Sequence, residues 1–580
     1  MESGSSQRDE ICRHCQDTSK HIQEAYQNPS IDLGTFITEG DRQTARALVS
    51  CPGTELMDLE YRGHSVGKIA FHDMALAVKA AGPESLEEKH VNLWKDHIRA
   101  IVVAYEAARR VLDSYAVDSI ITFNNYAVLL GPYLAALDTG VSFYTITHAS
   151  HRNADRRRMV MTPGLLRNLP PKLANDWEER WQDLCLPADT IGEIAADTIR
   201  KFSGQGSHVY SPSQGMDLQS LYDELGIPRE NKVLVAYTSS LDERVALNTL
   251  ADALSINWSP TDSFKDHFEW IDMLIEYSKA RPWLSVVIRV HPREGLTKGS
   301  KLVSEHLKGL MERYSEQSDV IMVWPNDAIS SYDLAEIADV ATSLWSSIGL
   351  ELMRLGVPFL HATAGHGPYP KQTDYFPCAS SPADYISILE QLFSRGPRLK
   401  TLRAAYRWYH LSQLACALLL DEYQPDLELE NFPMPMKSDQ FKPLVDIIEG
   451  RTTTRDIWYQ QLAHRNSSKH QLLETISILL HLNRIIFRMY TELVAETPIS
   501  LSIDGLALPV GTVMGELRKT EDGFYCFVYN GRTYTRRSKL ISRLVEMIRA
   551  EIVNIRQQSD APLPTQSSSV SKEQAAQAGF

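Results

Sequence analysis

The sequence predicts an α/β fold of two Rossmann-like domains facing each other, followed by a C-terminal α+β accessory module. Two observations predict the paired domains: strand-like and helix-like segments alternate in two series, and the linker-like YSPSQG at 210–215 separates the series. A third predicts the module, because the alternation stops near residue 400 and hairpin-type turns appear after residue 500. In such sheets, ligands bind beyond the carboxyl ends of the strands.

The first series follows a polar N-terminal segment that we assign to residues 1–60. Its periodicity alternates between apolar spacing typical of helices and runs typical of strands. The predicted elements are a helix at 92–115, a strand at 117–123, a helix at 126–140, a strand at 141–147 and mostly helical sequence at 163–206. Residues 61–215 are therefore predicted to form the N-terminal, acceptor-side domain.

The second series is assigned to residues 216–423, the predicted C-terminal Rossmann-like domain that would bind the donor. An amphipathic helix is predicted at 264–282. One long helix is predicted at 402–423, with the sequence LRAAYRWYHLSQLACALLLDEY. The predicted strands lie at 232–240, 284–292, 318–324, 339–344 and 357–363. These strands alternate with helical stretches, which implies βαβ units and a parallel sheet.

The accessory module is predicted at 435–556, after a Pro-rich and acidic linker at 424–440. A strongly apolar helix at 475–494 is interpreted as a core helix, with a membrane-surface helix as the alternative. Turn pairs predict a small β element of hairpins before a helix at 537–556: Asp504-Gly505, Asp522-Gly523 and Asn530-Gly531. Residues 557–580 have the composition of a disordered tail.

Composition excludes several function classes. The 580 residues carry a net charge of −14, which makes the chain a poor general binder of nucleic acid. An odd count of 7 Cys does not suggest a disulfide framework, so we expect a reducing cytoplasmic location. The N-terminus has no apolar signal region and no apolar run is long enough to span a membrane, although peripheral association with the inner face of the membrane is left open.

The first candidate motif is Arg289-Val290-His291-Pro292-Arg293, at the end of a predicted strand. Alternation along the strand places Arg289 and His291 on one face, and Pro292 ends the ladder. The motif therefore predicts an imidazole at the mouth of the cleft, with Arg293 beside it. The structural alternative is a capped strand end with a surface arginine.

The second candidate motif runs from Ser346-Ser347 to Glu351, where a predicted strand ends and a short helix begins. Hydroxyls and free N–H groups at a helix N-terminus suit a phosphate. Glu351 lies one turn further on the same face, where a carboxylate could accept hydrogen bonds from a ribose diol. The alternative is an ordinary Ser N-cap with a first-turn Glu.

Together, His291-Pro292 and Ser346-Ser347 resemble the paired motifs of bacterial capsule polysaccharide biosynthesis proteins and related surface-carbohydrate glycosyltransferases of the GT-B fold. Some of these enzymes use CMP-activated sialic acid or Kdo. The resemblance spans about residues 115–365 and includes TSSLDE at 238–243, FKDHFEW at 264–270, VIRVHPRE at 287–294 and WSSIGLELMRLGVP at 345–358. It implies that His291 binds the donor phosphate, Ser346 and Ser347 the phosphate or nucleotide, and Glu351 the ribose.

The catalytic base departs from the pattern of that family, whose first lobe usually carries an acidic–acidic–Gly motif. The matching strand end here carries His148 and His151, and an imidazole titrating near pH 6.5 could take the acceptor proton. The alternative is a packed His148 and a surface His151. The substrate-binding candidates are Asn124 and Asn125 on the acceptor side and Ser239, Ser240 and Glu243 in the cleft-facing turn.

Two further features are interpreted structurally. Arg156-Arg157-Arg158 is assigned to a solvated basic patch, with an anionic acceptor or phospholipid surface as the alternative. Cys12 and Cys15 form a CxxC without a matching second pair, so we predict reduced thiols and no metal. No Asp-x-Asp, P-loop or GxGxxG motif occurs in the sequence, and no cofactor is expected.

The sequence therefore predicts an enzyme: a metal-independent, inverting glycosyltransferase that moves a sugar from a nucleotide donor to a hydroxyl of a surface glycan or glycoconjugate. The expected partners are a nucleotide-sugar, preferably a CMP-activated ulosonic acid, and a glycan, glycolipid or protein acceptor. Alternatives of the same fold are a glycerophosphotransferase and a non-hydrolysing nucleotide-sugar epimerase. A further alternative is a non-catalytic GT-B-like scaffold.

Overall fold

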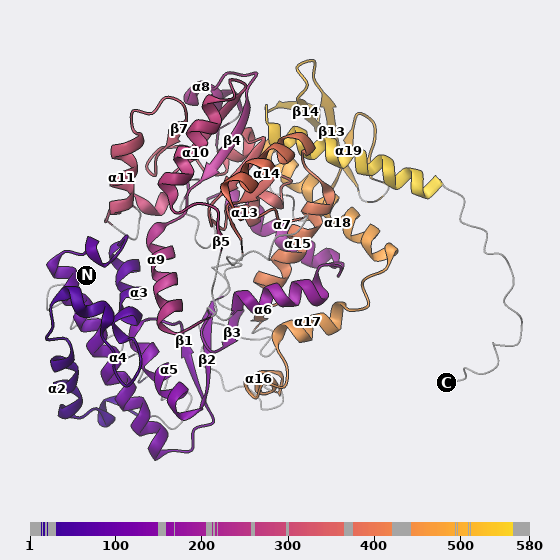
Figure 1. Ribbon diagram of the computed structural model, residues 1–580. Helices are drawn as coiled ribbons and strands as arrows, with labels where there is room; N and C mark the ends of the chain where they lie inside the picture. Colours follow the sequence, from indigo (N-terminus) through magenta and orange to yellow (C-terminus); the bar gives the residue numbers. More distant parts are fainter. Residues whose placement is uncertain are drawn as a thin grey trace, which may run out of the picture.

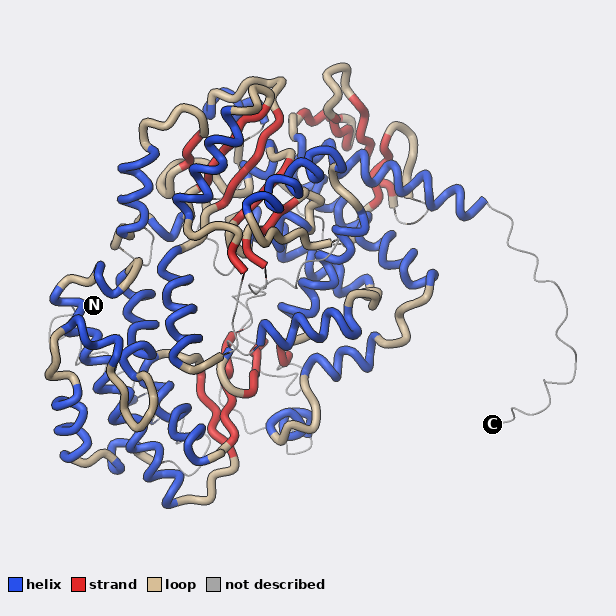
Figure 2. The backbone as a smooth tube through the Cα atoms, in the orientation of Figure 1, coloured by secondary structure: helices blue, strands red, loops and turns tan. Residues whose placement is uncertain are grey.

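In the computed structural model of the protein, two sheet-centred lobes are followed by a C-terminal α+β module (Figures 1 and 2). The residues that the structure describes are 13, 16–17, 20, 31–148, 158–166, 169–204, 211–212, 215–216, 218–256, 261–296, 301–364, 375–419, 442–493, 495, 497–508, 510 and 512–560. The predicted α/β fold class, with two sheet-centred lobes and a C-terminal α+β module, is confirmed, with differences in the first lobe.

The first lobe is built on a four-stranded sheet of order β1-β2-β3-β11, packed against long helices. Its elements are α2 (Glu39–Leu48), α3 (Val66–Val78), α4 (Glu88–Ser114), β1 (Ser119–Phe123), α5 (Ala127–Thr139), β2 (Ser142–His148), β3 (Arg158–Pro163), α6 (Leu169–Asp176) and α7 (Ala188–Phe202). Strands β1 and β2 pair in parallel around α5, as the βαβ pattern predicts. Strand β3 runs antiparallel to β2, so the lobe holds a mixed sheet where we predicted a Rossmann-like parallel one.

Part of the polar segment 1–60 folds onto this lobe. Thr38 and Asp41 form a capping box at the start of α2, each side chain binding the other's backbone N–H. The Asp41 carboxylate also pairs with the Arg110 guanidinium of α4 at 2.6 Å. The arginine lowers the pKa of Asp41 far below its usual range. The ion pair fixes α2 against α4, which explains why a polar sequence is ordered here.

The second lobe carries a five-stranded parallel sheet of order β7-β6-β4-β8-β9, whose β4 and β6 are almost entirely buried. Its helices are α8 (Leu218–Leu225), α9 (Leu241–Ala253), α10 (His267–Lys279), α11 (Glu305–Tyr314), α12 (Asp333–Ile337), α13 (Ile348–Met353), α14 (Pro382–Arg395) and α15 (Leu399–Tyr409). Its strands are β4 (Lys232–Tyr237), β5 (Thr261–Asp262), β6 (Leu284–Arg289), β7 (Ile321–Val323), β8 (Val340–Ser343), β9 (Phe359–His361) and β10 (Thr363–Ala364). All five predicted strands are present.

The two lobes are joined through helix α3 of the first and helix α9 of the second (Figure 1). Ala246 and Leu250 of α9 belong to the hydrophobic core of the first lobe. At the end of α3, the buried Lys79 ammonium donates to the carbonyls of Gly295 and Leu302 at 2.7 Å each. The loop that follows the His291-Pro292 motif is therefore held by the first lobe.

The predicted helix over 402–423 is wrong in its second half. Helix α15 gives way to a π turn at His410–Leu414, and Ala417–Leu419 forms strand β11. This strand pairs antiparallel with Arg158–Val160 of β3, so it completes the sheet of the first lobe. A short apolar run is compatible with either helix or strand. Here, hydrogen bonding to the open edge of β3 stabilises the strand.

The C-terminal module packs on the second lobe and on α7. Its elements are α16 (Lys442–Ile448), α17 (Thr454–Leu462), α18 (Ser468–Thr491), β12 (Ser500–Ile503), β13 (Val513–Lys519), β14 (Tyr525–Tyr529), β15 (Arg532–Thr535) and α19 (Lys539–Asp560). Helix α18 is buried in the largest hydrophobic core, so the core interpretation of the apolar helix is confirmed. Helix α19 runs four residues into the predicted tail, and 561–580 lie outside the described residues.

The small sheet of the module contains the predicted hairpins and one exception. Asn530 and Gly531 both have positive φ, 48° and 72°, which closes the tight β14–β15 hairpin. Strands β13 and β14 are antiparallel as predicted, but β12 pairs with β13 in parallel. The Asp504-Gly505 turn closes only a bridge between Ile503 and Leu506.

Replacing His410 with phenylalanine is expected to flatten the pH dependence of stability. The ring has no exposed surface, lies 5.0 Å from Trp458, and its nitrogens have no hydrogen-bond partner in the part of the chain that is described. Burial lowers its pKa to about 3. Below pH 6.5 the histidine therefore takes up a proton in the unfolded state but not in the folded state. The free energy of unfolding consequently decreases as the pH is lowered.

Denaturation of wild type and His410→Phe at pH 7 and pH 5 tests this expectation. The decrease in the free energy of unfolding from pH 7 to pH 5 should be about 1–2 kcal/mol smaller in the variant than in wild type. His464→Phe, at an exposed position, is the control and should behave as wild type. Equal losses in wild type and His410→Phe would show that His410 does not contribute to the pH dependence.

Candidate functional site

A pocket at the carboxyl ends of β4 and β6 brings together five of the predicted donor-binding residues. It encloses about 510 Å³, including space open to solvent. The predicted residues in its lining are Arg289, His291, Ser346, Ser347 and Glu351. Residues separated by 62 positions in the chain thus meet in one place, as expected for ligand sites at the carboxyl edge of a parallel sheet.

Arg289 places a buried cation in this pocket. Its side chain is 1% exposed, and Nη1 donates to the carbonyl oxygen of Trp324. Neither Nε nor Nη2 has a hydrogen-bond partner, and no carboxylate lies within 4.0 Å of the guanidinium, among the described residues. Burial lowers the pKa of Arg289 to about 10, which leaves it charged at neutral pH. A buried, unpaired guanidinium is costly to maintain, and its free N–H groups suit an anion.

His291 lies at the mouth of the same pocket as a neutral imidazole. Its backbone N–H donates to Thr238 Oγ1 at 2.8 Å, and its Nδ1 accepts the N–H of Arg293 at 3.2 Å. Burial, with the nearby cations of Arg293 and Arg289, lowers the pKa of His291 to about 3. With Nδ1 acting as an acceptor, the single proton of the ring lies on Nε2, which makes His291 a neutral hydrogen-bond donor.

Ser346 and Ser347 precede α13, as predicted. Ser346 Oγ accepts the N–H of Ile348 at 3.4 Å, and its own N–H donates to Ser343 Oγ at 3.2 Å. Ser347 is the N-cap residue, but its side chain makes no capping hydrogen bond. Ser347 is therefore not an ordinary capping serine, because its hydroxyl does not bind a backbone N–H of the helix. The loop is held by Ser343 and Ser346, and both Ser346 and Ser347 border the pocket.

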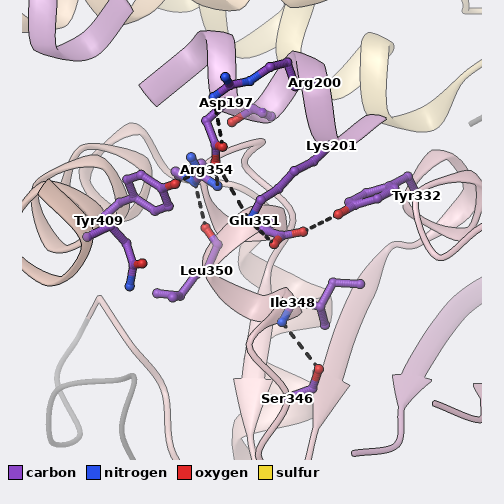
Figure 3. A network of polar contacts seen from close by, with 12 residues as sticks. Asp197, Arg200, Lys201, Tyr332, Ser346, Ile348, Leu350, Glu351, Arg354 and Tyr409 are labelled. Carbon is purple, nitrogen blue, oxygen red and sulfur yellow. Dashed lines mark hydrogen bonds and ion pairs between the residues drawn. The ribbon is translucent and has the colours of Figure 1, made fainter. Parts of the chain in front are cut away.

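Glu351 borders the pocket within a network of polar contacts (Figure 3). Its carboxylate accepts from Lys201 Nζ at 2.5 Å and from the Tyr332 hydroxyl at 2.6 Å. Burial and the carboxylate raise the pKa of Tyr332 well above its ordinary value. Lys201 belongs to α7, where Asp197 one turn earlier accepts from the Tyr409 hydroxyl at 2.6 Å. The charge of Glu351 is thus balanced by Lys201, and its position is fixed from two elements.

Several lining residues were not predicted from the sequence. These residues are Ser211, Tyr237, Thr238, Ser331, Tyr332 and Ile348. Ser211 and Ser331 hydroxyls lie 2.7 Å apart, which links the interdomain connection to the loop before α12. Thr238 could have been found, because it directly follows the buried strand β4 as His291 follows β6. The serines carry no such signal, since the chain fold alone brings them to the pocket.

Other predicted residues lie outside this lining. Arg293 donates to the buried carboxylate of Asp242 at 2.6 Å and to Ser240 Oγ at 2.8 Å, and Glu243 is 3.5 Å from the same nitrogen. Ser239 is also buried, and its hydroxyl accepts the N–H of Trp345 at 3.3 Å. These residues therefore hold the loop of His291 in place and do not line the pocket.

The predicted acceptor-side residues follow β1 and β2. Asn124, with φ 66°, accepts from Thr147 Oγ1 at 2.8 Å. The side-chain amide of Asn125 is 2.7 Å from Thr145 Oγ1, so both amides connect the two strand ends. His148 is the last residue of β2, with its side chain not described, and His151 lies outside the described residues.

The remaining candidates are only partly within the described chain. Arg158 pairs with Glu193 at 2.5 Å, whereas Arg156 and Arg157 lie outside the described residues, as do Cys12 and Cys15. Within the described ranges, no group of three or more His, Cys, Asp and Glu side chains is arranged to hold a metal ion. In the same ranges, no helix is long and apolar enough to cross a membrane.

Comparisons with known proteins give similarities of fold only. No protein-family profile matches the sequence, and no curated protein does. Among solved structures, the chain is similar to the KpsC β-Kdo 2,4-transferase of Thermosulfurimonas dismutans, with 11% identity over 50% of this chain and 78% of that one, at a TM-score of 0.29. A UDP-GlcNAc 2-epimerase from Neisseria meningitidis has 14% identity over 60% and 94% of the chains, at a TM-score of 0.26. These values are too low to transfer an activity.

Proposed function

We propose that this protein is a glycosyltransferase that binds the phosphate of a nucleotide-sugar donor in the pocket of Arg289 and His291. The observation that carries the proposal is the buried guanidinium of Arg289, which has two nitrogens without partners and no carboxylate within 4.0 Å among the described residues. An anion in the pocket would supply hydrogen-bond acceptors for these nitrogens and a negative charge beside the guanidinium. Our preferred donor is a CMP-activated ulosonic acid, and the reaction is expected to proceed without a metal ion.

The pocket residues suit the departure of a nucleotide. In an inverting displacement, an acceptor hydroxyl attacks the anomeric carbon while the bond from that carbon to the phosphate oxygen breaks. Arg289 and the Nε2–H of His291 would donate to the phosphate as its charge grows, together with the hydroxyls of Ser346 and Ser347. A preorganised set of donors in a buried site is worth far more than the same donors in water.

The acceptor proton requires a base from the first lobe. We propose His148, the last residue of β2, or His151, three positions later in the sequence. Loss of a general base slows turnover by about 10²–10⁴-fold. One of the two single alanine variants, and the double alanine variant, should therefore lose turnover while retaining nucleotide binding. Full turnover in the double variant would rule out both histidines as the base.

Nucleotide binding and turnover together test the proposed function. Thermal shift of the full chain with CMP, CDP and UDP is expected to show stabilisation, because a ligand that binds only the folded state raises Tm. Incubation with CMP-, CDP- and UDP-linked donors should then release CMP from a CMP-sugar. Release of epimerised UDP-sugar, transfer of glycerophosphate, or absence of any nucleotide binding would each overturn the proposal.

A further inference from the structure

A second pocket lies between β3, β11, α7 and α17, and it encloses about 810 Å³, including space open to solvent. None of its lining residues borders the pocket of Arg289 and His291. Its polar and aromatic side chains are Arg158, Asp189, Thr190, Glu193, Thr454 and Trp458. Two of these, Thr454 and Trp458, come from the C-terminal module, whose role the sequence does not explain.

This second pocket lies at the carboxyl edge of the first sheet. Arg158 begins β3, and its neighbour Met159 pairs with His148, the last residue of β2. Leu419, the last residue of β11, pairs with Arg158. The pocket is therefore adjacent to the strand end that carries the proposed base, at the edge where α/β sheets bind their ligands.

The charges in this pocket do not favour an anion. Arg158 is paired with Glu193 at 2.5 Å, so its cation is already neutralised. Asp189 is exposed and has no ion pair with any residue that the structure describes. The carboxylates of Asp189 and Glu193, with the hydroxyls of Thr190 and Thr454, form a set of hydrogen-bond acceptors with few free cations. Such a set suits a ligand that presents many hydroxyl donors.

Trp458 supplies the apolar part of the same pocket. Its ring is half-buried and is held by His410, with ring centroids 5.0 Å apart and an interplanar angle of 84°. Held in this way, the indole is a rigid surface that loses little conformational freedom when a ligand packs on it. An aromatic surface beside carboxylates matches the two sides of a pyranose, its C–H face and its hydroxyl edge.

We propose that this pocket binds a neutral pyranose residue of the acceptor glycan, with Trp458 against its C–H face and Asp189 and Glu193 accepting from its hydroxyls. Its role as the acceptor site rests on the proposed function. Helix α7 connects the two pockets, since Glu193 borders one and Lys201 binds Glu351 in the other. Eight residues of helix, about 12 Å along the axis, separate Glu193 from Lys201, a distance that a glycan chain can span. The C-terminal module would then complete the acceptor site.

Binding of simple sugars to the full chain tests this inference. The probes are the methyl glycosides of glucose, galactose, mannose and N-acetylglucosamine, measured by saturation-transfer difference NMR. Wild type is expected to bind at least one of them. Trp458→Ala should weaken that binding about five-fold or more, and Asp189→Asn, at an exposed position where folding is unaffected, about three- to ten-fold. Trp283→Ala, at a 42% exposed tryptophan on another surface, is the matched control and should bind as wild type.

The outcomes separate this inference from the proposed function. No binding of any probe to wild type, or unchanged binding by both Trp458→Ala and Asp189→Asn, would overturn the acceptor pocket. Thermal shift with CMP and UDP on the same samples reports the donor pocket independently. Sugar binding without nucleotide binding would refute the proposed function and leave this pocket standing as a carbohydrate site, whereas nucleotide binding without sugar binding refutes only the pocket.

Discussion

Replacing Arg289 with methionine is expected to lower the affinity for the donor nucleotide about 100-fold while leaving the folded state at least as stable as wild type within about 1 kcal/mol. The two effects have one cause. A charged hydrogen bond to an anion contributes about 1.5–3 kcal/mol, and the guanidinium has two nitrogens available for it. Without a bound anion, the buried and unpaired charge of Arg289 destabilises the folded state. Methionine removes this charge while filling a similar volume.

Isothermal titration with CMP and CDP, together with chemical denaturation, measures both effects in the Arg289→Met protein. Arg543→Met is the matched control, because Arg543 also has a buried nitrogen without a partner among the described residues but does not border the pocket. Its nucleotide affinity should equal that of wild type. An Arg289→Met protein that binds nucleotide as tightly as wild type would remove the main support for the donor pocket.

Replacing Glu474 with alanine is expected to lower the free energy of unfolding by about 3–5 kcal/mol, the largest stability effect that we predict. The carboxylate has no exposed surface. It accepts from Arg407 at 2.6 Å, from Arg403 at 3.1 Å and from the N–H of Leu186 at 2.8 Å. Its removal leaves the buried guanidinium of Arg407 without its partner, and it disconnects α18 from α15 and from the loop before α7.

Urea denaturation of Glu474→Ala and Glu474→Gln separates charge from volume, because glutamine keeps the shape and removes the charge. Both variants should be strongly destabilised if the unpaired arginine dominates. Glu305→Ala, which breaks an exposed pair with Lys308, should change the free energy of unfolding by less than about 1 kcal/mol. A loss in Glu474→Ala no larger than that of Glu305→Ala would show that the buried network does not stabilise the fold.

The second lobe could be predicted from sequence because its signals are local. The buried strands of the parallel sheet are mostly apolar, and the polar residues at or after the ends of β6 and β8 meet at one edge by the geometry of the sheet. Arg289, His291 and Ser346 were found in this way. What the sequence could not show is that no described carboxylate lies within 4.0 Å of Arg289, since that depends on every side chain packed around it.

The first lobe was harder to predict because its decisive contacts join distant segments. Strand β11 lies more than 250 residues after its partner β3, and its sequence ALL also fits a helix. Arg293 illustrates the same limit within the site. Its position after His291 suggests a ligand contact, but the buried carboxylate of Asp242 binds it at 2.6 Å. A carboxylate partner from another element carries no signal in the local pattern.

The late completion of the first sheet has a consequence for synthesis of the chain. A ribosome that has made the first 215 residues has released β1, β2 and β3, but the strand that covers β3 is still about 200 residues away. Until then β3 presents unpaired N–H and C=O groups, which are a template for pairing with other chains. The first lobe therefore cannot reach its final form during translation of its own sequence. A nascent chain in this state is a natural client for a chaperone, and a fragment ending at residue 215 should aggregate where the full chain folds.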